Sequence, residues 1–266
     1  MLLEMSLKMS SITILGSSGS KSPTSGSSAF LLNDVHVMDA GNLLIPLEEK
    51  SADIETIWLT HSHLDHISDI AYILDNYYEK RTKTLKLCGL KETLETIKKH
   101  FLNNKIWPDF SNIAIYNSKD MTLKYEVIEI GKRYPISEHE TIEAFNTDHT
   151  VPSCGYIISK DNNSLLISAD TYTLDNVIDI VNSNNSISTL VIECSFPSSM
   201  FSLAKKSKHL TPELLFKRLK PLEEKGLKLY VNHMKPSYEN IIKEEIESLK
   251  GFWNVSILKD DDKIYF

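Results

Sequence analysis

The sequence predicts an α/β fold, because apolar runs typical of buried strands alternate along the chain with segments of helical periodicity. One such run, residues 164–171, is followed directly by a helical pattern over 174–181. Polar residues able to bind metals or transfer protons stand where the predicted strands end. Because α/β sheets place their sites at the carboxyl ends of strands, these residues indicate the functional site: Asp39, His61, His149, Asp170, Glu193 and His233.

The chain up to residue 146 is predicted to hold seven strands and two helices. Asn33 and Asp34 are turn residues between two apolar runs, which is typical of a hairpin. The Ser/Gly/Pro-rich loop 16–28 is interpreted as a flexible connector, with the border of a phosphate site as the alternative. Helices are expected at 66–74 and 90–102, and strands at 12–15, 29–32, 35–38, 54–59, 84–88, 123–130 and 141–146.

The second half continues the alternation. Thr211 is a plausible N-cap with Pro212 at the first helical position, which predicts a helix start. Two last strands, 255–258 and 264–266, are expected to pair with each other across the acidic turn at 260–262. The remaining elements are strands at 155–159, 164–171, 189–192 and 227–231, and helices at 174–181 and 240–249.

Composition and charge limit the classes of protein. With 266 residues, 41% of them hydrophobic and 24% charged, the chain can bury a sizeable core, and we expect one domain spanning 1–266. The net charge of −7 weighs against binding long nucleic acid through a basic surface. It does not exclude a small anionic substrate, because bound divalent ions can supply positive charge locally. We recognise no signal peptide and no membrane span, so no membrane partner is expected.

The cysteines indicate the compartment. Cys88, Cys154 and Cys194 are widely spaced and odd in number, which argues against a disulfide framework and favours a reducing, cytoplasmic location. We interpret all three as small buried hydrophobic residues.

The motif Thr-His-Ser-His-Leu-Asp-His at 60–66 follows a predicted strand. In an extended chain, residues two apart point the same way, so His61 and His63 can bind one metal ion. Asp65 and His66 follow where the chain turns and can reach a second ion. Imidazoles with one carboxylate suit Zn²⁺, although Mn²⁺ and Fe²⁺ accept similar sets.

Later residues would complete two sites. His149 would join His61 and His63, whereas His233 would join Asp65 and His66, and Asp170 could bridge the two ions. Two ions about 3.5–4 Å apart can lower the pKa of a shared water and clamp a phosphodiester. We therefore expect two divalent ions, with Zn²⁺ foremost.

Proton transfer needs a further group. His209, if held by Glu193, could protonate a leaving oxygen; the alternatives are a helix-capping contact for His209 and a structural ion pair for Glu193. Asp65 is counted as catalytic as well as metal-binding. Asp39 is expected to hold the histidine loop from behind. The remaining histidines, His36, His100 and His139, are expected to be exposed to solvent.

Residues on the substrate side are the hardest to identify. Trp107 and Phe110 flank Pro108, and they form either an aromatic plug on the core or a wall that stacks a base. Ser153, shortly after His149, is a further candidate for substrate binding.

Residues 60–66 resemble the signature of the metallo-β-lactamase fold superfamily. The resemblance implies an αββα sandwich of two mixed sheets covered by helices, with a binuclear metal site at one edge. Segments 63–68, 105–110, 149–156, 168–171, 209–212 and 233–236 resemble the class II cyclic-nucleotide phosphodiesterases.

This resemblance implies hydrolysis of the 3′-ester bond of 3′,5′-cyclic AMP or cyclic GMP by a metal-bridged hydroxide, giving the 5′-nucleotide. A homodimer is expected from the same family. Ribonuclease Z, a relative in the superfamily, has a Glu and a His that act in proton transfer, in the same chain order as Glu193 and His209. The implied metal ligands are His61, His63, Asp65, His66, His149, Asp170 and His233.

Two other functions remain open. A ribonuclease Z-like tRNA 3′-processing endonuclease would share the site, but the net charge of −7 and the lack of a basic Gly-rich arm count against it. A non-catalytic metal- or nucleotide-binding domain would need neither a full ligand set nor a proton donor.

Overall fold

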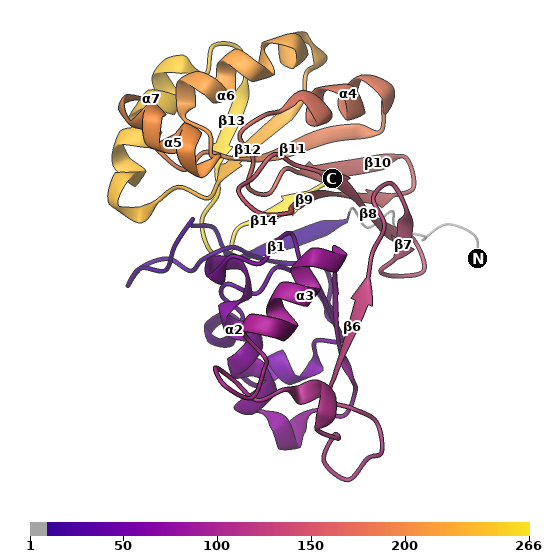
Figure 1. The fold of residues 1–266 in the computed structure, drawn as a ribbon. Coiled ribbons are helices and arrows are strands. Elements are labelled where there is room, and N and C mark those ends of the chain that lie inside the picture. The colour runs from indigo at the N-terminus through magenta and orange to yellow at the C-terminus, as the bar shows by residue number, and fades with distance from the viewer. Residues whose placement is uncertain (1–9) are drawn as a thin grey trace, which may run out of the picture.

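The computed structural model describes residues 10–266, and within them two seven-stranded sheets pack face to face between outer helices (Figure 1). The first sheet has the order β14-β1-β2-β3-β4-β5-β6. Its strands are β1 (Ser11–Gly16), β2 (Ala29–Leu31), β3 (His36–Met38), β4 (Thr56–Trp58), β5 (Leu85–Gly89), β6 (Leu123–Val127) and β14 (Lys263–Tyr265).

The second sheet has the order β13-β12-β11-β10-β9-β8-β7. Both sheets are mixed, because β3 to β6 and β10 to β13 run parallel whereas the other pairs are antiparallel. The second sheet's strands are β7 (Arg133–Pro135), β8 (Glu140–Asn146), β9 (Cys154–Lys160), β10 (Asn163–Ile167), β11 (Ile187–Glu193), β12 (Lys228–Asn232) and β13 (Asn254–Ile257).

Helices cover the outer face of each sheet, as Figure 1 shows. On the first sheet lie α1 (Leu44–Leu47), α2 (Leu64–Asp75) and α3 (Lys91–His100). On the second lie α4 (Asp175–Ser183), α5 (Phe201–Ser207), α6 (Pro212–Leu219) and α7 (Glu239–Leu249). Three apolar layers result, one under each set of helices and one between the sheets. The predicted αββα sandwich is confirmed.

The strand register brings several strand ends to one edge. In the first sheet Met38 pairs with Trp58, so Asp39 and the histidine loop emerge together. In the second sheet Ile167 pairs with Val191, and Glu193 pairs with Asn232. The residues that follow these strands therefore meet at the same end of the sandwich, as parallel pairing requires.

Two hydrogen bonds tie the start of the histidine loop to the opposite sheet. Tyr156 on β9 donates through its hydroxyl to the carbonyl of Leu59 at 2.8 Å, and the Cys154 amide donates to the carbonyl of Thr60 at 3.1 Å. The sheet that does not contain the loop thus helps to position it.

The expected pairing of 255–258 with 264–266 is wrong. Strand β13 pairs with β12 in the second sheet, whereas β14 pairs with β1 in the first, so the acidic turn carries the chain across the sandwich. Asp260 explains this path, because its carboxylate accepts from the Ser17 amide at 2.9 Å and from the Gly26 amide at 2.7 Å. The turn is therefore anchored to the N-terminal loop.

Other differences follow from element length. The short elements α1, β7 and α5 contain too few residues to show a period and were not predicted. Strand β10 ends at Ile167, so Asp170 stands on a loop beyond it. The three cysteines are buried and unpaired, as expected. Among residues 10–266, every helix is too short or too polar to cross a bilayer.

Replacing Tyr156 with Phe should destabilise the protein by about 1–3 kcal/mol, because it leaves the buried carbonyl of Leu59 without its main donor. Denaturant unfolding monitored by fluorescence would measure this. The control Tyr116→Phe alters a ring that is 55% exposed and should change stability by less than about 0.5 kcal/mol. Equal effects of both variants would contradict the inter-sheet role of Tyr156.

Candidate metal centre

The structure brings the histidines and acidic residues at the strand ends into one buried cluster. His61 and His63 follow β4, and Asp65 and His66 lie in the first turn of α2. Ligand atoms within 4.8 Å of one another form three overlapping groups: His61, His63, His149 and Asp170; Asp65, His66 and His233; and Asp170, His209 and His233.

Asp170 belongs to the first group and also faces the second. Its Oδ2 atom is 3.6 Å from His61 Nε2 and 3.4 Å from His66 Nε2, and its Oδ1 atom is 3.1 Å from His233 Nε2. Burial alone would raise the pKa of Asp170, but His233 and His66 outweigh it and hold that pKa well below its ordinary value. The carboxylate therefore faces both halves of the cluster.

Asp39 and Thr60 hold two of the imidazoles from behind. Asp39 Oδ2 lies 2.7 Å from His66 Nδ1 and accepts from the Thr60 hydroxyl at 2.8 Å. Thr60 Oγ1 lies 3.0 Å from His61 Nδ1. Since Thr60 donates its hydrogen to Asp39, it can only accept from His61. Both rings thus carry hydrogen on Nδ1 and turn Nε2 toward Asp170.

His149 is held in the same way, by a backbone carbonyl. Its Nδ1 atom lies 3.1 Å from the Lys208 carbonyl, which can only accept, so its Nε2 atom is the free one. That atom lies 3.1 Å from His63 Nδ1. On the other side of the cluster, His66 Nε2 lies 3.1 Å from His233 Nε2.

These contacts test whether the cluster fits a metal. Among the described residues, His61 Nε2 and Asp170 Oδ1 are buried without a hydrogen-bond partner. Burying polar atoms without partners is costly, and a divalent cation is the partner that suits imidazole nitrogen and carboxylate oxygen together. Imidazoles that bind metals characteristically have their other nitrogen held by an acceptor. The cluster therefore fits divalent metal ions.

Glu193 and His209 form the predicted pair beside the cluster. His209 Nδ1 lies 2.9 Å from Glu193 Oε1, which also accepts from the Thr171 amide at 3.2 Å. Burial would lower the pKa of His209, but the charge and hydrogen bond of Glu193 outweigh it and raise that pKa. The capping interpretation of His209 is wrong, because the cap of α6 is the Thr211 side chain, which accepts from the Leu214 amide.

The base-stacking wall is not found where it was expected. Phe110 is 4% exposed, belongs to the core under the first sheet, and lines a hollow with residues 75–80 at the far end of α2. That end lies about 15 Å along the helix from His66. Trp107 packs edge-on against Tyr72 with the ring centres 5.6 Å apart. The aromatic-plug alternative therefore describes this segment.

The structure also places Ser153 and His36. Ser153 is buried, and its hydroxyl accepts from Thr147 at 2.8 Å, so it closes the His149 loop on itself. His36 was expected to be exposed to solvent but is half-buried, and its Nδ1 atom accepts from Trp58 Nε1 at 3.1 Å. His100 and His139 are exposed, as expected.

The loop after β1 is part of the site and not a simple connector. The Ser18 amide donates to Gly26 at 3.0 Å, and the Gly19 amide donates to Met234 at 3.1 Å. A Cβ atom on Gly19 would lie 2.7 Å from His233 Nδ1, closer than real contacts allow. Only glycine therefore lets this loop pack on the His233 ring.

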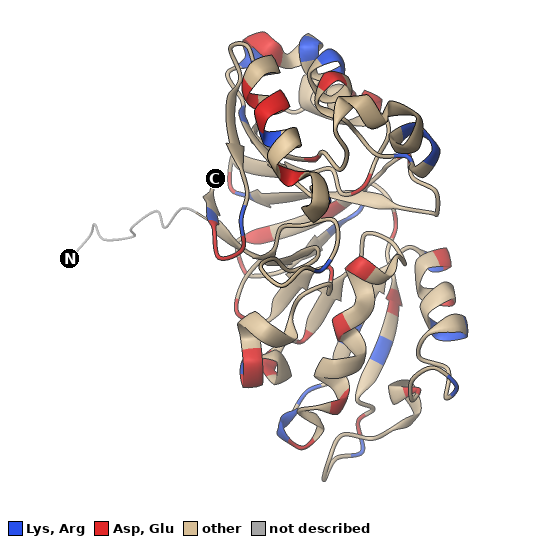
Figure 2. Cartoon of the chain, turned by 90° about the vertical axis from the view of Figure 1, so that its left-hand side faces the viewer, with Lys and Arg blue, Asp and Glu red and all other residues tan. Residues whose placement is uncertain are grey.

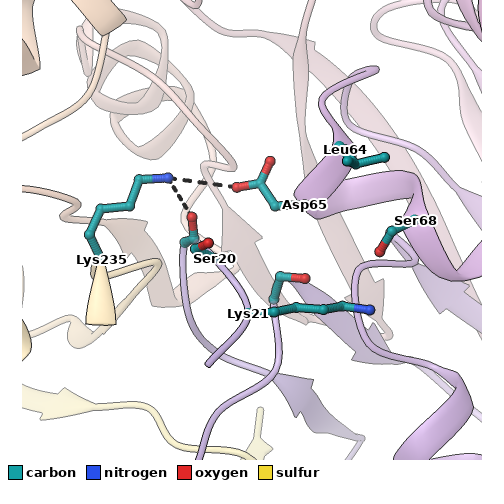
Figure 3. A pocket seen from close by; sticks show the side chains of 8 residues that line it. Ser20, Lys21, Leu64, Asp65, Ser68 and Lys235 are labelled. Carbon is teal, nitrogen blue, oxygen red and sulfur yellow. Dashed lines mark hydrogen bonds and ion pairs between the residues drawn. The ribbon is translucent and has the colours of Figure 1, made fainter. Parts of the chain in front are cut away.

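A cavity of about 410 Å³ opens beside Asp65 (Figure 3). Lys235 reaches into it from the loop after β12, with Nζ 3.8 Å from Asp65 Oδ2, and donates to the Gly19 carbonyl. Lys21 lines the other side and forms an ion pair with Asp69 at 2.6 Å. No sequence pattern indicated a role for these lysines, although the phosphate-site alternative for loop 16–28 pointed to this region.

The backbone is strained around the cluster. Four residues at its edge adopt positive φ, a conformation that costs non-glycine residues of order 1–3 kcal/mol where it is unfavourable. These are Asp39 at 57°, Ala169 at 52°, Lys208 at 56° and His233 at 64°.

Residues 46–153 match a family model described as class-II cAMP phosphodiesterases, which confirms the predicted resemblance for this part of the chain. The 3′,5′-cyclic-nucleotide phosphodiesterase 1 of Saccharomyces cerevisiae is 32% identical over 74 residues, 27% of this chain and 20% of that protein. Exodeoxyribonuclease WalJ of Streptococcus pneumoniae is 27% identical over 175 residues, 64% of this chain and 57% of that protein. The chain thus spans a fifth of the first relative and just over half of the second.

Solved structures resemble the chain over nearly its whole length. Unliganded yeast PDE1 superposes with a TM-score of 0.82 at 20% identity, covering 97% of this chain and 99% of that one. YhfI from Bacillus subtilis, a metallo-β-lactamase fold protein, superposes with a TM-score of 0.73 at 18% identity, covering 96% and 98%. The chain has the metallo-β-lactamase fold.

Replacing Asp39 with Asn should weaken binding of Zn²⁺ by about 10- to 100-fold, because the carboxylate holds the imidazole of His66 and the hydroxyl of Thr60. Competition with a chromophoric chelator would measure the affinity. Asp34→Asn, at an exposed turn, is the matched control and should bind like the unaltered protein. An unchanged affinity in Asp39→Asn would show that Asp39 does not support the cluster.

Proposed function

We propose that this chain is a metal-dependent phosphodiesterase that hydrolyses 3′,5′-cyclic nucleotides, cyclic AMP or cyclic GMP, to 5′-nucleotides. The observation that carries the proposal is the Glu193–His209 pair standing beside two groups of metal-binding side chains. Asp170 belongs to the first group and lies 3.4 Å from His66 and 3.1 Å from His233 of the second. The match of residues 46–153 to the class-II family supports the substrate class. We further propose that the chain acts as one domain over 1–266, in the cytoplasm and as a homodimer.

In this proposal two divalent ions, with Zn²⁺ foremost and Mn²⁺ or Fe²⁺ as alternatives, occupy the cluster. When bound, such ions supply a nucleophile at neutral pH and neutralise charge on the phosphoryl oxygens. Asp170 would belong to both sites. One site would use His61, His63 and His149, and the other Asp65, His66 and His233.

His209 would donate a proton to the departing 3′-oxygen. Its ring lies between those of His149 and His233, with ring centres 5.0 and 5.5 Å away, so it is adjacent to both halves of the cluster. Glu193 would hold its Nδ1 atom and stabilise the protonated ring, and the raised pKa of His209 agrees with that role.

The cavity beside Asp65 is our candidate for the nucleotide pocket. Its volume of about 410 Å³ lies within the usual range for small-molecule sites. Lys235 would face the anionic phosphate, because its ammonium group lies beside a proposed metal ligand, Asp65. Leu64, which is 65% exposed, would supply an apolar contact at the mouth.

A nuclease function is the second candidate, because the exodeoxyribonuclease relative covers 64% of this chain. The charge distribution disfavours it and likewise disfavours a ribonuclease Z-like tRNA-processing activity. The net charge is −7, and Figure 2 shows Lys and Arg interspersed with Asp and Glu along the helices. Binding long nucleic acid depends on many basic contacts with phosphates.

A turnover assay on metal-reconstituted protein would separate these functions. The substrates are cyclic AMP, cyclic GMP, a bis-aryl phosphodiester, single-stranded DNA and tRNA, each with and without chelator. We expect chelator-sensitive release of 5′-nucleotide from a cyclic nucleotide. Degradation of DNA or tRNA without turnover of either cyclic nucleotide would overturn the proposal, and binding without turnover would favour a non-catalytic domain.

Replacing His209 with Ala should lower kcat for a cyclic nucleotide by about 10²- to 10⁴-fold, because it removes the proton donor to the leaving oxygen. Metal content, measured by mass spectrometry, should stay unchanged. His139→Ala removes an exposed histidine and serves as the control. Full turnover in His209→Ala with normal metal content would reject the proton-donor role.

A further inference from the structure

We propose that Ser195 is a positioning residue that selects the tautomer of His233 and holds the Glu193–His209 pair beside it. The proposal deepens the proposed function, because both histidines belong to the site described above. Ser195 stands two residues after Glu193, beyond the end of β11.

The backbone places Ser195 firmly between the segments that carry the two histidines. Its amide donates to the Leu210 carbonyl at 3.1 Å, next to His209, and its carbonyl accepts from the Lys235 amide at 3.1 Å, two residues after His233. The residue is fully buried, so its hydroxyl can bond only with protein groups.

Three polar atoms surround the Ser195 hydroxyl. Its Oγ atom donates to Glu193 Oε2 at 2.8 Å, lies 3.0 Å from His233 Nδ1, and lies 3.1 Å from His209 Nδ1. A hydroxyl has one hydrogen to donate and two lone pairs to accept with. The hydrogen goes to Glu193, since a carboxylate only accepts, and the two lone pairs are left for the imidazoles.

The tautomer of His233 follows from this count. Its Nδ1 atom must carry the hydrogen to bond with Ser195, so its Nε2 atom is free of hydrogen. That Nε2 atom lies 3.1 Å from Asp170 Oδ1 and 3.6 Å from Asp65 Oδ2, inside the cluster. Ser195 therefore presents the metal-binding nitrogen of His233 to the site.

The first sheet contains a matching arrangement. There Thr60 donates to Asp39 and lies 3.0 Å from His61 Nδ1 and 3.4 Å from His66 Nδ1. Each sheet thus contributes one carboxylate, one hydroxyl that donates to it, and two imidazoles that face the hydroxyl. The second set consists of Glu193, Ser195, His209 and His233. This repetition in separate parts of the chain argues that the hydroxyl orients rings and does not merely fill space.

The test compares Ser195→Ala with Ser164→Ala. Ser164 is equally buried, but its hydroxyl lies 2.8 Å from those of Ser159 and Ser186 and contacts no imidazole. Zn²⁺ affinity is measured by chelator competition. We expect Ser195→Ala to bind Zn²⁺ about 10- to 100-fold more weakly, and Ser164→Ala to bind like the unaltered protein. Ser195→Thr, which restores a hydroxyl, should recover most of the affinity. Equal affinities in Ser195→Ala and the unaltered protein would overturn the proposal.

A second measurement uses the unaltered, metal-free protein and so does not depend on how the variants fold. Long-range ¹H–¹⁵N spectra of the histidine rings distinguish the two tautomers. We expect the assigned His233 ring to carry hydrogen on Nδ1, and a ring without hydrogen on Nδ1 would refute the proposal. Neither measurement uses substrate. Failure to hydrolyse cyclic nucleotides would therefore reject the proposed function but would not contradict the role of Ser195.

Discussion

The site depends on one requirement, which is that several imidazoles present a hydrogen-free nitrogen to the same small buried volume. Such nitrogens are acceptors, and two of them repel at the 3.1 Å that separates His66 Nε2 from His233 Nε2 unless a cation or a hydrogen lies between them. Each ring therefore has to be held from its other side. Asp39 does this for His66, and the Lys208 carbonyl does it for His149.

Holding these rings imposes costs on the surrounding backbone. Ala169, Lys208 and His233 adopt positive φ beside the cluster, a conformation that is costly for L-residues other than Asn and Asp. Gly19 is required for a related reason, since a side chain there would collide with the His233 ring. The sandwich sustains this strain because its two sheets are joined at the site, for example through the Tyr156 hydroxyl on the Leu59 carbonyl.

Two of the charged residues around the cavity beside Asp65 differ in sign from the chain as a whole. The chain carries a net charge of −7, yet the cavity beside Asp65 is lined by Lys21 and Lys235. Both lysines lie beside carboxylates, Lys21 beside Asp69 and Lys235 beside Asp65. In the proposed function they would face a small anion, whereas long nucleic acids need many basic contacts. The aromatic pair at Trp107 and Phe110 instead packs around α2. These two side chains therefore contribute to the packing of that region and not to the cavity beside Asp65.

The α/β class and the residues of the cluster could be predicted from the sequence, and the αββα architecture was implied by the resemblance of residues 60–66 to the metallo-β-lactamase fold superfamily. Strand-forming runs and their polar ends are local patterns, so His61, His149, Asp170 and His233 were recognisable one segment at a time. Where 255–258 and 264–266 pair could not be predicted, because the choice between a hairpin and two sheets depends on Asp260 reaching the Ser17 and Gly26 amides.

The roles of Ser195, Lys21 and Lys235 were likewise hidden. A serine or a lysine carries no local signal of function, and each acquires its partners from segments distant in the chain. By itself, the sequence determined which chemical groups are available and at which strand ends they stand. Only the tertiary structure decided which nitrogen of each imidazole faces the cluster. That choice depends on the hydrogen bond made by the other nitrogen, and only folding brings its partner within about 3 Å.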